Sequence, residues 1–170
     1  AKGVAIIPPS GGAGIMAADH AEALNLSMPQ PSPETEKVLR ASIPDFGAPR
    51  NPCDLTAQVA SNPASYDACM EAMMSDPQYG AAVIPVVYSH HATTQLRMEQ
   101  LRPYATKHGK PILIAWIPEQ LEGPGVIVAD SSPELSVFRS MRRLMNAIRL
   151  WQEYYDTKPM GEAAPPAALK

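Results

Sequence analysis

Short apolar runs alternate with longer amphipathic segments along the 170 residues of this chain. Three of these runs predict buried strands, at Val4–Ile7, Ala81–Tyr88 and Pro111–Ile117. Shorter strands are predicted at Leu26–Met28, as an edge strand, and at Val126–Val128. Because continuous apolar runs are typical of strands that are covered on both faces, the pattern indicates a parallel sheet between layers of helices.

The amphipathic segments between these runs predict helices over about 14–24, 33–43, 63–74, 93–108 and 133–155. Three of them have a clear start signal, in which serine or asparagine precedes proline: Ser32-Pro33, Asn62-Pro63 and Ser132-Pro133. The order of the elements predicts an α/β fold, a three-layer α/β/α sandwich whose mainly parallel sheet has about five strands. Right-handed crossovers would place the three long runs side by side at its centre.

Helical spacing also predicts which side chains face the core. On the first helix these are Ile15, Ala18 and Leu24, together with Ala21 or Glu22. On the last helix the predicted buried stripe consists of Leu135, Phe138, Met141, Met145, Ile148 and Trp151. Proline removes a donor from a strand, so Pro85 predicts a bulge or local irregularity.

The composition gives domain limits and excludes several classes of function. Residues 1–156 are predicted to form one domain, and 157–170 an Ala- and Pro-rich linker or tail that cannot bury enough apolar surface to fold. The net charge of −3 gives no general attraction to nucleic acid or anionic membrane. With no apolar run of membrane-spanning length and no signal-peptide pattern, a cytoplasmic location is expected.

Metal binding and disulfide bonding are not expected from the cysteine and histidine positions. Cys53 and Cys69 form no C-x-x-C pair, and the histidines lack the spacing of zinc ligands. No catalytic residue and no metal ligand is therefore predicted.

The segment after the first strand, Ser10-Gly11-Gly12-Ala13-Gly14, is the strongest candidate for a binding site. Glycines between a strand and a helix let an anion approach backbone N–H groups, and a helix N-terminus adds partial positive charge. The segment is not a Walker loop, and its spacing is not that of a dinucleotide-binding fingerprint. An anion-binding loop and an ordinary tight turn both fit it.

Several motifs, in this order and spacing, resemble one module of the NDP-forming acyl-CoA synthetases, which are relatives of succinyl-CoA synthetase. The resemblance extends from about Lys2 to Tyr155. The motifs that carry it are Val4–Asp19 with its glycines, Ser32–Leu39, Asn51-Pro52-Cys53-Asp54-Leu55, Lys110–Trp116, and Val126–Val128 followed by Ser132-Pro133-Glu134. The module is the second flavodoxin-like ligase domain of these enzymes, so the resemblance implies a flavodoxin-like fold.

The resemblance implies that the chain works with other domains of the same polypeptide or complex. These are a CoA-binding domain, a ligase domain that carries a phosphorylated histidine, and an ATP-grasp module. CoA, ATP or ADP, and Mg²⁺ are implied for the full-length protein, and none of them for this chain alone. The Ser10–Gly14 segment would bind the phosphate of the phosphohistidine, while Asn51 and Asp54 would support that loop.

Simpler roles remain open for these residues. Ser10 could be only a helix cap, and Asn51 and Asp54 could form an Asx-turn around Pro52. His90 and His91 are interpreted as part of a polar loop between strand and helix, because the family's Ser-His-Thr-Gly-like motif is missing. The isolated chain is predicted to be catalytically inactive. Two alternatives are a non-catalytic docking module and the synthetase-like regulatory part of a protein acetyltransferase.

Overall fold

The computed structural model describes residues 1–57, 61–88 and 91–157. In this part of the chain, four parallel strands form one sheet in the order β1-β2-β3-β4. The strands are β1 (Gly3–Ile6), β2 (Tyr79–Val86), β3 (Ile112–Trp116) and β4 (Leu135–Phe138). The parallel α/β sandwich predicted from the sequence is confirmed, with four strands in place of about five.

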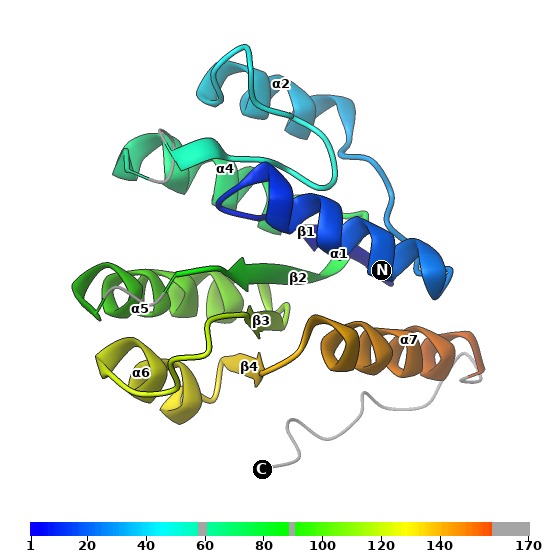
Figure 1. Ribbon diagram of the computed structural model, residues 1–170. Helices are drawn as coiled ribbons and strands as arrows, with labels where there is room; N and C mark the ends of the chain where they lie inside the picture. Colours follow the sequence, from blue (N-terminus) through cyan, green and yellow to red (C-terminus); the bar gives the residue numbers. More distant parts are fainter. Residues whose placement is uncertain (58–60, 89–90, 158–170) are drawn as a thin grey trace.

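Helices cover both faces of the sheet (Figure 1). On one face, α1 (Gly11–Ala23) and α7 (Met141–Thr157) pack on Val4, Ile6 and Val83. On the other face, the apolar side chains come from α4 (Pro63–Ser75), α5 (His91–His108) and α6 (Pro124–Ser131). Helix α2 (Pro33–Ser42) packs against the outer side of α4.

Two predicted strands are absent, and one observed strand lies where a helix was predicted. Leu26–Met28 has no strand conformation, although the Ser27 carbonyl accepts a hydrogen bond of 3.1 Å from Val4 N. Val126–Val128 lies in α6, which begins at Pro124 after Gly123. This helix buries Val126 and Ala129 and exposes Ile127, a helical spacing that a three-residue apolar run cannot reveal.

The last helix begins later in the chain than the sequence predicts. Ser132 is the C-cap of α6, and Leu135–Phe138 form β4 beside β3. Helix α7 begins only at Met141, and the Ser140 hydroxyl accepts a hydrogen bond of 3.4 Å from Arg143 N. Pro133 therefore follows a helix instead of opening one, which is the other position where proline is common.

The buried side of α1 also differs from the prediction. Ala13, Gly14, Ala17 and Ala21 face the sheet, whereas Ile15 is 65% exposed. Ala21 is buried as predicted, and Leu24, just after the helix, packs against the same core. Small residues let this helix lie close to the sheet, while Ile15 and Met16 point toward solvent. On α7, Met141, Met145 and Ile148 are buried as predicted, while Gln152 takes the next buried position along the helix.

The central strand β2 accommodates Pro85 without a bulge, because Pro85 pairs in register with Ala115 of β3. Ile7 N donates to the Val83 carbonyl at 2.9 Å, so Val83 and the residue two positions later face β1. Strand β1 ends at Ile6, so no strand lies opposite the nitrogen of Pro85. The missing donor costs no ladder hydrogen bond, and the irregularity predicted here is absent.

Candidate functional site

The glycine segment lies at the carboxyl end of β1 and forms the first turn of α1. The helix begins at Gly11, three residues earlier than predicted, and Ser10 is its N-cap with φ −156° and ψ 149°. The Ser10 carbonyl accepts a hydrogen bond of 3.2 Å from Gly14 N, whereas the Ser10 side chain makes no capping hydrogen bond. The N–H groups of the first turn have no acceptor within the helix, and the helix dipole adds positive charge there.

The three glycines of this turn have different surroundings. A Cβ atom on Gly14 would lie 3.1 Å from Pro8 Cγ and 3.5 Å from Pro52 Cβ, so close packing explains this glycine. A Cβ atom on Gly11 would lie 2.9 Å from the carboxylate oxygen Asp54 Oδ2. A Cβ atom on Gly12 would meet no atom within 4 Å, and Gly12 is exposed. Packing in the described chain therefore gives no reason for a glycine at position 12.

Asn51 is buried and holds the free edge of β1. Its side-chain oxygen accepts a hydrogen bond of 2.9 Å from Ile6 N, and its Nδ2 donates to Val4 O at 2.7 Å and to Pro29 O at 3.0 Å. These bonds replace part of a neighbouring strand. The Asn51-Pro52 peptide bond is cis. The contacts position the strand from which the glycine turn continues.

Asp54 lies beside the glycine turn and forms an Asx-turn with the residues that follow it. Its Oδ1 accepts a hydrogen bond of 3.0 Å from Thr56 N, while Oδ2 is the atom nearest the Gly11 position. A carboxylate at a helix N-terminus stabilises the helix. It also occupies the Gly11 side of the turn, so the open approach for an external anion is at Gly12.

Thr56, next to this carboxylate, is conformationally strained. Its φ is +62°, in the left-handed region that β-branched residues rarely adopt. Its hydroxyl is buried and has no hydrogen-bond partner among the residues that the structure describes. Strained, unsatisfied residues of this kind occur mainly at functional sites.

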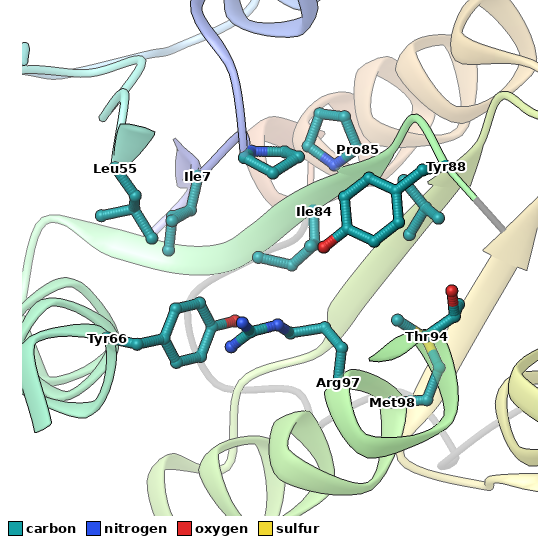
Figure 2. Close-up of a pocket in the computed structure, with 11 residues that line it drawn as sticks. Ile7, Leu55, Tyr66, Ile84, Pro85, Tyr88, Thr94, Arg97 and Met98 are labelled. Atoms are coloured by element: carbon teal, nitrogen blue, oxygen red, sulfur yellow. The ribbon is translucent and has the colours of Figure 1, made fainter. Parts of the chain in front are cut away.

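A recess opens at the same edge of the sheet, between the ends of β1 and β2 (Figure 2). Buried apolar side chains of Ile7, Leu55, Ile84 and Met98 line its inner part. Its remaining lining residues are Pro9, Tyr66, Pro85, Val86, Tyr88, Thr94 and Arg97. The recess continues into an outer hollow that shares Pro9, Tyr88 and Arg97.

Arg97 is the only positively charged residue among the described side chains that line the recess. Its guanidinium lies over the Tyr66 ring, 3.5 Å from the centroid, and Nη1 donates to Gln100 Oε1 at 3.1 Å. Burial raises the pKa of Tyr66 to about 12, although Arg97 acts in the opposite direction. The sequence analysis missed these residues. Tyr88 is the last residue of the predicted strand Ala81–Tyr88, and that position at the carboxyl end could have pointed to them.

The two neighbouring histidines are only partly described. His90 lies outside the described residues, and His91 is the first residue of α5. Cys53 and Cys69 are free and buried, and burial raises the pKa of both thiols. In the described ranges, the His, Cys, Asp and Glu side chains form no group of three that could hold a metal ion. None of the described helices is long and apolar enough to cross a membrane.

Comparison with known sequences identifies the family of this domain. The sequence model of the Ligase-CoA domain matches residues 4–103. The chain belongs to the Ligase-CoA domain family. The curated trans-feruloyl-CoA synthase FCS1 of an unknown prokaryotic organism is 28% identical over 122 residues, which is 68% of this chain and 17% of that protein.

Solved structures share the fold at low sequence identity. PH0766 from Pyrococcus horikoshii OT3 matches with a TM-score of 0.76 and 19% identity, over 92% of this chain and 36% of that one. The dinucleotide-forming acetyl-coenzyme A synthetase 1 of Ca. Korarchaeum cryptofilum, in complex with phosphate and ADP, matches with a TM-score of 0.71 and 16% identity, over 92% and 33%. The Ligase-CoA domain described here therefore spans about a third of these chains, and it shares their flavodoxin-like fold.

Proposed function

We propose that this Ligase-CoA domain serves an NDP-forming acyl-CoA synthetase by binding the phosphate of a phosphohistidine that another domain carries. In the full-length protein the reaction is acyl-CoA + NDP + phosphate ⇌ acid + CoA + NTP. The observation that carries the proposal is Gly12, an open glycine in the first turn of a helix at the carboxyl end of a parallel strand. In open α/β sheets, ligands bind at this edge.

The first turn of α1 provides the donors that a phosphate needs. Backbone N–H groups of Gly12 and Ala13 have no acceptor within the helix, and the absence of a side chain at Gly12 lets an anion approach them closely. The Ser10 hydroxyl makes no capping bond and is available as a further donor. Asn51 and Asp54 support the turn from the opposite side through β1 and Gly11.

The surface around the turn has the character of an interface between domains. Apolar side chains at this edge of the sheet are exposed to solvent: Ile15, Val87, Tyr88, Leu96, Ile117, Leu121 and Ile127. Exposed apolar side chains that gather at one edge indicate contact with another protein surface. The occupant that fits the proposal is the histidine-bearing ligase domain, because it must bring its phosphate to the glycine turn.

The remaining chemistry belongs to other domains of the parent protein. A CoA-binding domain would hold CoA, and an ATP-grasp module would hold ATP or ADP with Mg²⁺. The described residues of this chain form no site that we assign to those groups. We place the parent protein in the cytoplasm, where these substrates are available. The isolated chain is expected to form neither a phosphoprotein nor a thioester.

The test is the substitution Gly12→Val in the full-length parent protein. Because Gly12 is exposed and a Cβ atom there touches nothing, the variant should fold normally. Its side chain should cover the N–H groups and lower the rate of phosphohistidine formation from labelled ATP by about 10²–10³-fold, the effect of removing an oxyanion-hole donor. Gly12→Ala should give a smaller loss.

A matched control is Ala64→Val, in the exposed first turn of α4. It introduces the same side chain at another helix N-terminus and should leave phosphorylation unchanged. If Gly12→Val folds normally and also leaves phosphorylation and turnover unchanged, the turn is only structural. The chain would then be a docking module.

A further inference from the structure

Helices α1 and α7 lie in contact on one face of the sheet, and both run away from its carboxyl edge (Figure 1). The strand register shows where they begin. Phe138 at the end of β4 pairs with Ala115, which pairs with Pro85 of β2. Pro85 lies two residues after Val83, the partner of Ile6 at the end of β1. Because α7 begins three residues after Phe138 and α1 five residues after Ile6, the two first turns lie at about the same level.

The side of α7 that faces α1 carries Arg142 in its first turn. Arg149 identifies this side, because it lines a hollow together with Ala23 and Leu24 from the end of α1. Residues seven positions apart lie on the same side of an α-helix, so Arg142 is directed toward α1 as Arg149 is. Successive residues are rotated by about 100°, so the neighbouring Arg143 lies on a different side of α7. Both arginines are exposed.

Arg142 and Arg143 stand where a positive charge is unfavourable for the helix. The N-terminus of a helix carries partial positive charge, and the first turn of α7 contains no acidic residue. Further along α7, Arg149 pairs with Glu153. Neither Arg142 nor Arg143 pairs with a carboxylate in the part of the chain that the structure describes. Residues that oppose local stability without an internal partner are typical of functional sites.

The glycine turn by itself has too little positive charge for a phosphate. A phosphate group carries about two negative charges at neutral pH. The N-terminus of α1 contributes the equivalent of about half a positive charge. The carboxylate of Asp54, beside Gly11, adds a negative charge at the same place. A cation from outside α1 is therefore needed to balance a phosphate at Gly12.

We propose that Arg142 supplies this charge as a second binding residue for the phosphate at Gly12. Its guanidinium would donate paired hydrogen bonds to two phosphate oxygens, while the first turn of α1 binds the same group through backbone N–H groups. The origin of the phosphate, on a histidine of another domain, rests on the proposed function. The contact between Arg142 and a phosphate does not, and it can be tested on this chain with inorganic phosphate.

The first measurement is a titration of the 170-residue chain with inorganic phosphate at constant ionic strength. It follows the NMR signals of the backbone amides and of the arginine Nε–H groups. We expect saturable shifts at the amides of Gly12 and Ala13 and at Arg142 Nε–H, with one common dissociation constant. Chloride over the same range of ionic strength should produce no saturable shift at these three groups.

Substitutions separate a direct contact from a general effect of charge. Arg142→Gln should weaken phosphate binding by about fivefold or more. The matched control Arg143→Gln removes the same charge from the same turn and should weaken it by less than about twofold, because salt screens charges without a direct contact. Arg142→Lys keeps the charge without the planar fork and should retain part of the affinity. Neither glutamine variant should lower the midpoint of urea unfolding, because each removes a cation from a helix N-terminus.

The inference is overturned if phosphate shifts no signal of the glycine turn, if Arg142 Nε–H does not respond, or if the two glutamine variants weaken binding equally. Its failure is distinct from that of the proposed function. In the full-length parent protein, loss of phosphorylation in Gly12→Val with normal phosphorylation in Arg142→Gln would refute only the role of Arg142. Weakened phosphate binding in Arg142→Gln together with a neutral Gly12→Val would refute only the phosphohistidine role of the glycine turn.

Discussion

At the amino end of the sheet, the polar side chains of Asp76 and Lys110 form hydrogen bonds with backbone groups, whereas at the carboxyl end apolar side chains face solvent. Asp76, just before β2, accepts hydrogen bonds from Ser32 N at 2.8 Å and Gln78 N at 2.9 Å. Lys110, just before β3, donates to Met74 O at 2.6 Å and to Asp76 O at 2.7 Å. The amino end is thus closed by internal bonds.

The carboxyl end combines the open Gly12, the strained Thr56 and the exposed apolar side chains. These features stabilise nothing within the described chain. The amino end is therefore expected to contribute mainly to stability, and the carboxyl end to the binding that we propose. Substitutions at the amino end should therefore lower the free energy of unfolding, whereas substitutions of these features at the carboxyl end should leave it nearly unchanged or raise it.

The largest loss of stability is expected for Asp76→Ala. Its carboxylate is buried, and its removal leaves two backbone donors unpaired and the Lys110 charge without its acidic neighbour. The expected cost is about 3–5 kcal/mol of unfolding free energy, measured by urea denaturation. The control Asp45→Ala, at an exposed position, should change it by about 0.5 kcal/mol or less. If Asp76→Ala lowers the unfolding free energy no more than Asp45→Ala does, these hydrogen bonds do not stabilise the amino end of the sheet.

The same carboxylate should make stability depend on acid pH. Burial opposes ionisation of Asp76, but the hydrogen bonds from Gln78 and Ser32 outweigh it and hold the pKa below its usual value. A lowered folded-state pKa contributes stability above the unfolded-state pKa of about 3.9, and this contribution is lost as the pH falls through the folded-state value. Asp76→Asn should flatten the decrease in stability between about pH 5 and pH 2. An unchanged slope would show that other carboxylates cause it.

The next largest loss is expected for Asn51→Ala. Its side chain is bonded to Ile6 N, Val4 O and Pro29 O, and alanine would leave these buried groups unpaired. The expected cost is about 2–3 kcal/mol. Asn146→Ala, on α7, loses a single exposed bond to Arg142 O and serves as the control. Equal effects of the two substitutions would refute a special role of Asn51 at the edge of β1.

At the carboxyl end, Thr56→Gly should raise stability. Glycine adopts a φ of +62° without strain, and its introduction removes the unsatisfied hydroxyl. We expect a gain of about 1 kcal/mol, measured by the midpoint of urea unfolding. Loss of stability would mean that the threonine side chain packs in a way that compensates for its backbone strain.

Asp54→Asn should increase the affinity of the glycine turn for inorganic phosphate. The Asp54 carboxylate lies beside Gly11 and repels an anion at the neighbouring Gly12. Asparagine keeps an oxygen that accepts the bond from Thr56 N while it removes the charge. An increase of about threefold to tenfold is expected at low ionic strength, with a smaller increase at high salt. Unchanged phosphate binding would place the anion elsewhere.

The smallest effect on stability is expected for Leu121→Ser, which changes a side chain that is 52% exposed. Unfolding free energy should change by about 0.5 kcal/mol or less. If this edge contacts the other ligase domain, the variant should weaken association between the separately produced domains. Leu150→Ser, on an exposed part of α7, is the control. Equal association of both variants would exclude Leu121 from the interface.

The sequence by itself determined the parallel α/β architecture and the place of the glycine turn, because both depend on local patterns. Continuous apolar runs specified β1, β2 and β3, and glycines after the first run specified where α1 begins to within three residues. The order of its motifs also pointed to the Ligase-CoA family. Local signals failed near the end of the chain, where Val126–Val128 and Leu135–Phe138 are too short to distinguish helix from strand without their neighbours.

Only the tertiary structure decided what surrounds each residue. It brought Asp54 beside Gly11, left Gly12 open, and stacked Arg97 on Tyr66 across two helices. It also turned Ile15 of α1 toward solvent, because alanines allow the helix to lie closer to the sheet. Such contacts join residues far apart in the chain, and the packing of whole elements sets them. Periodicity and spacing record only which residues are near one another along the backbone.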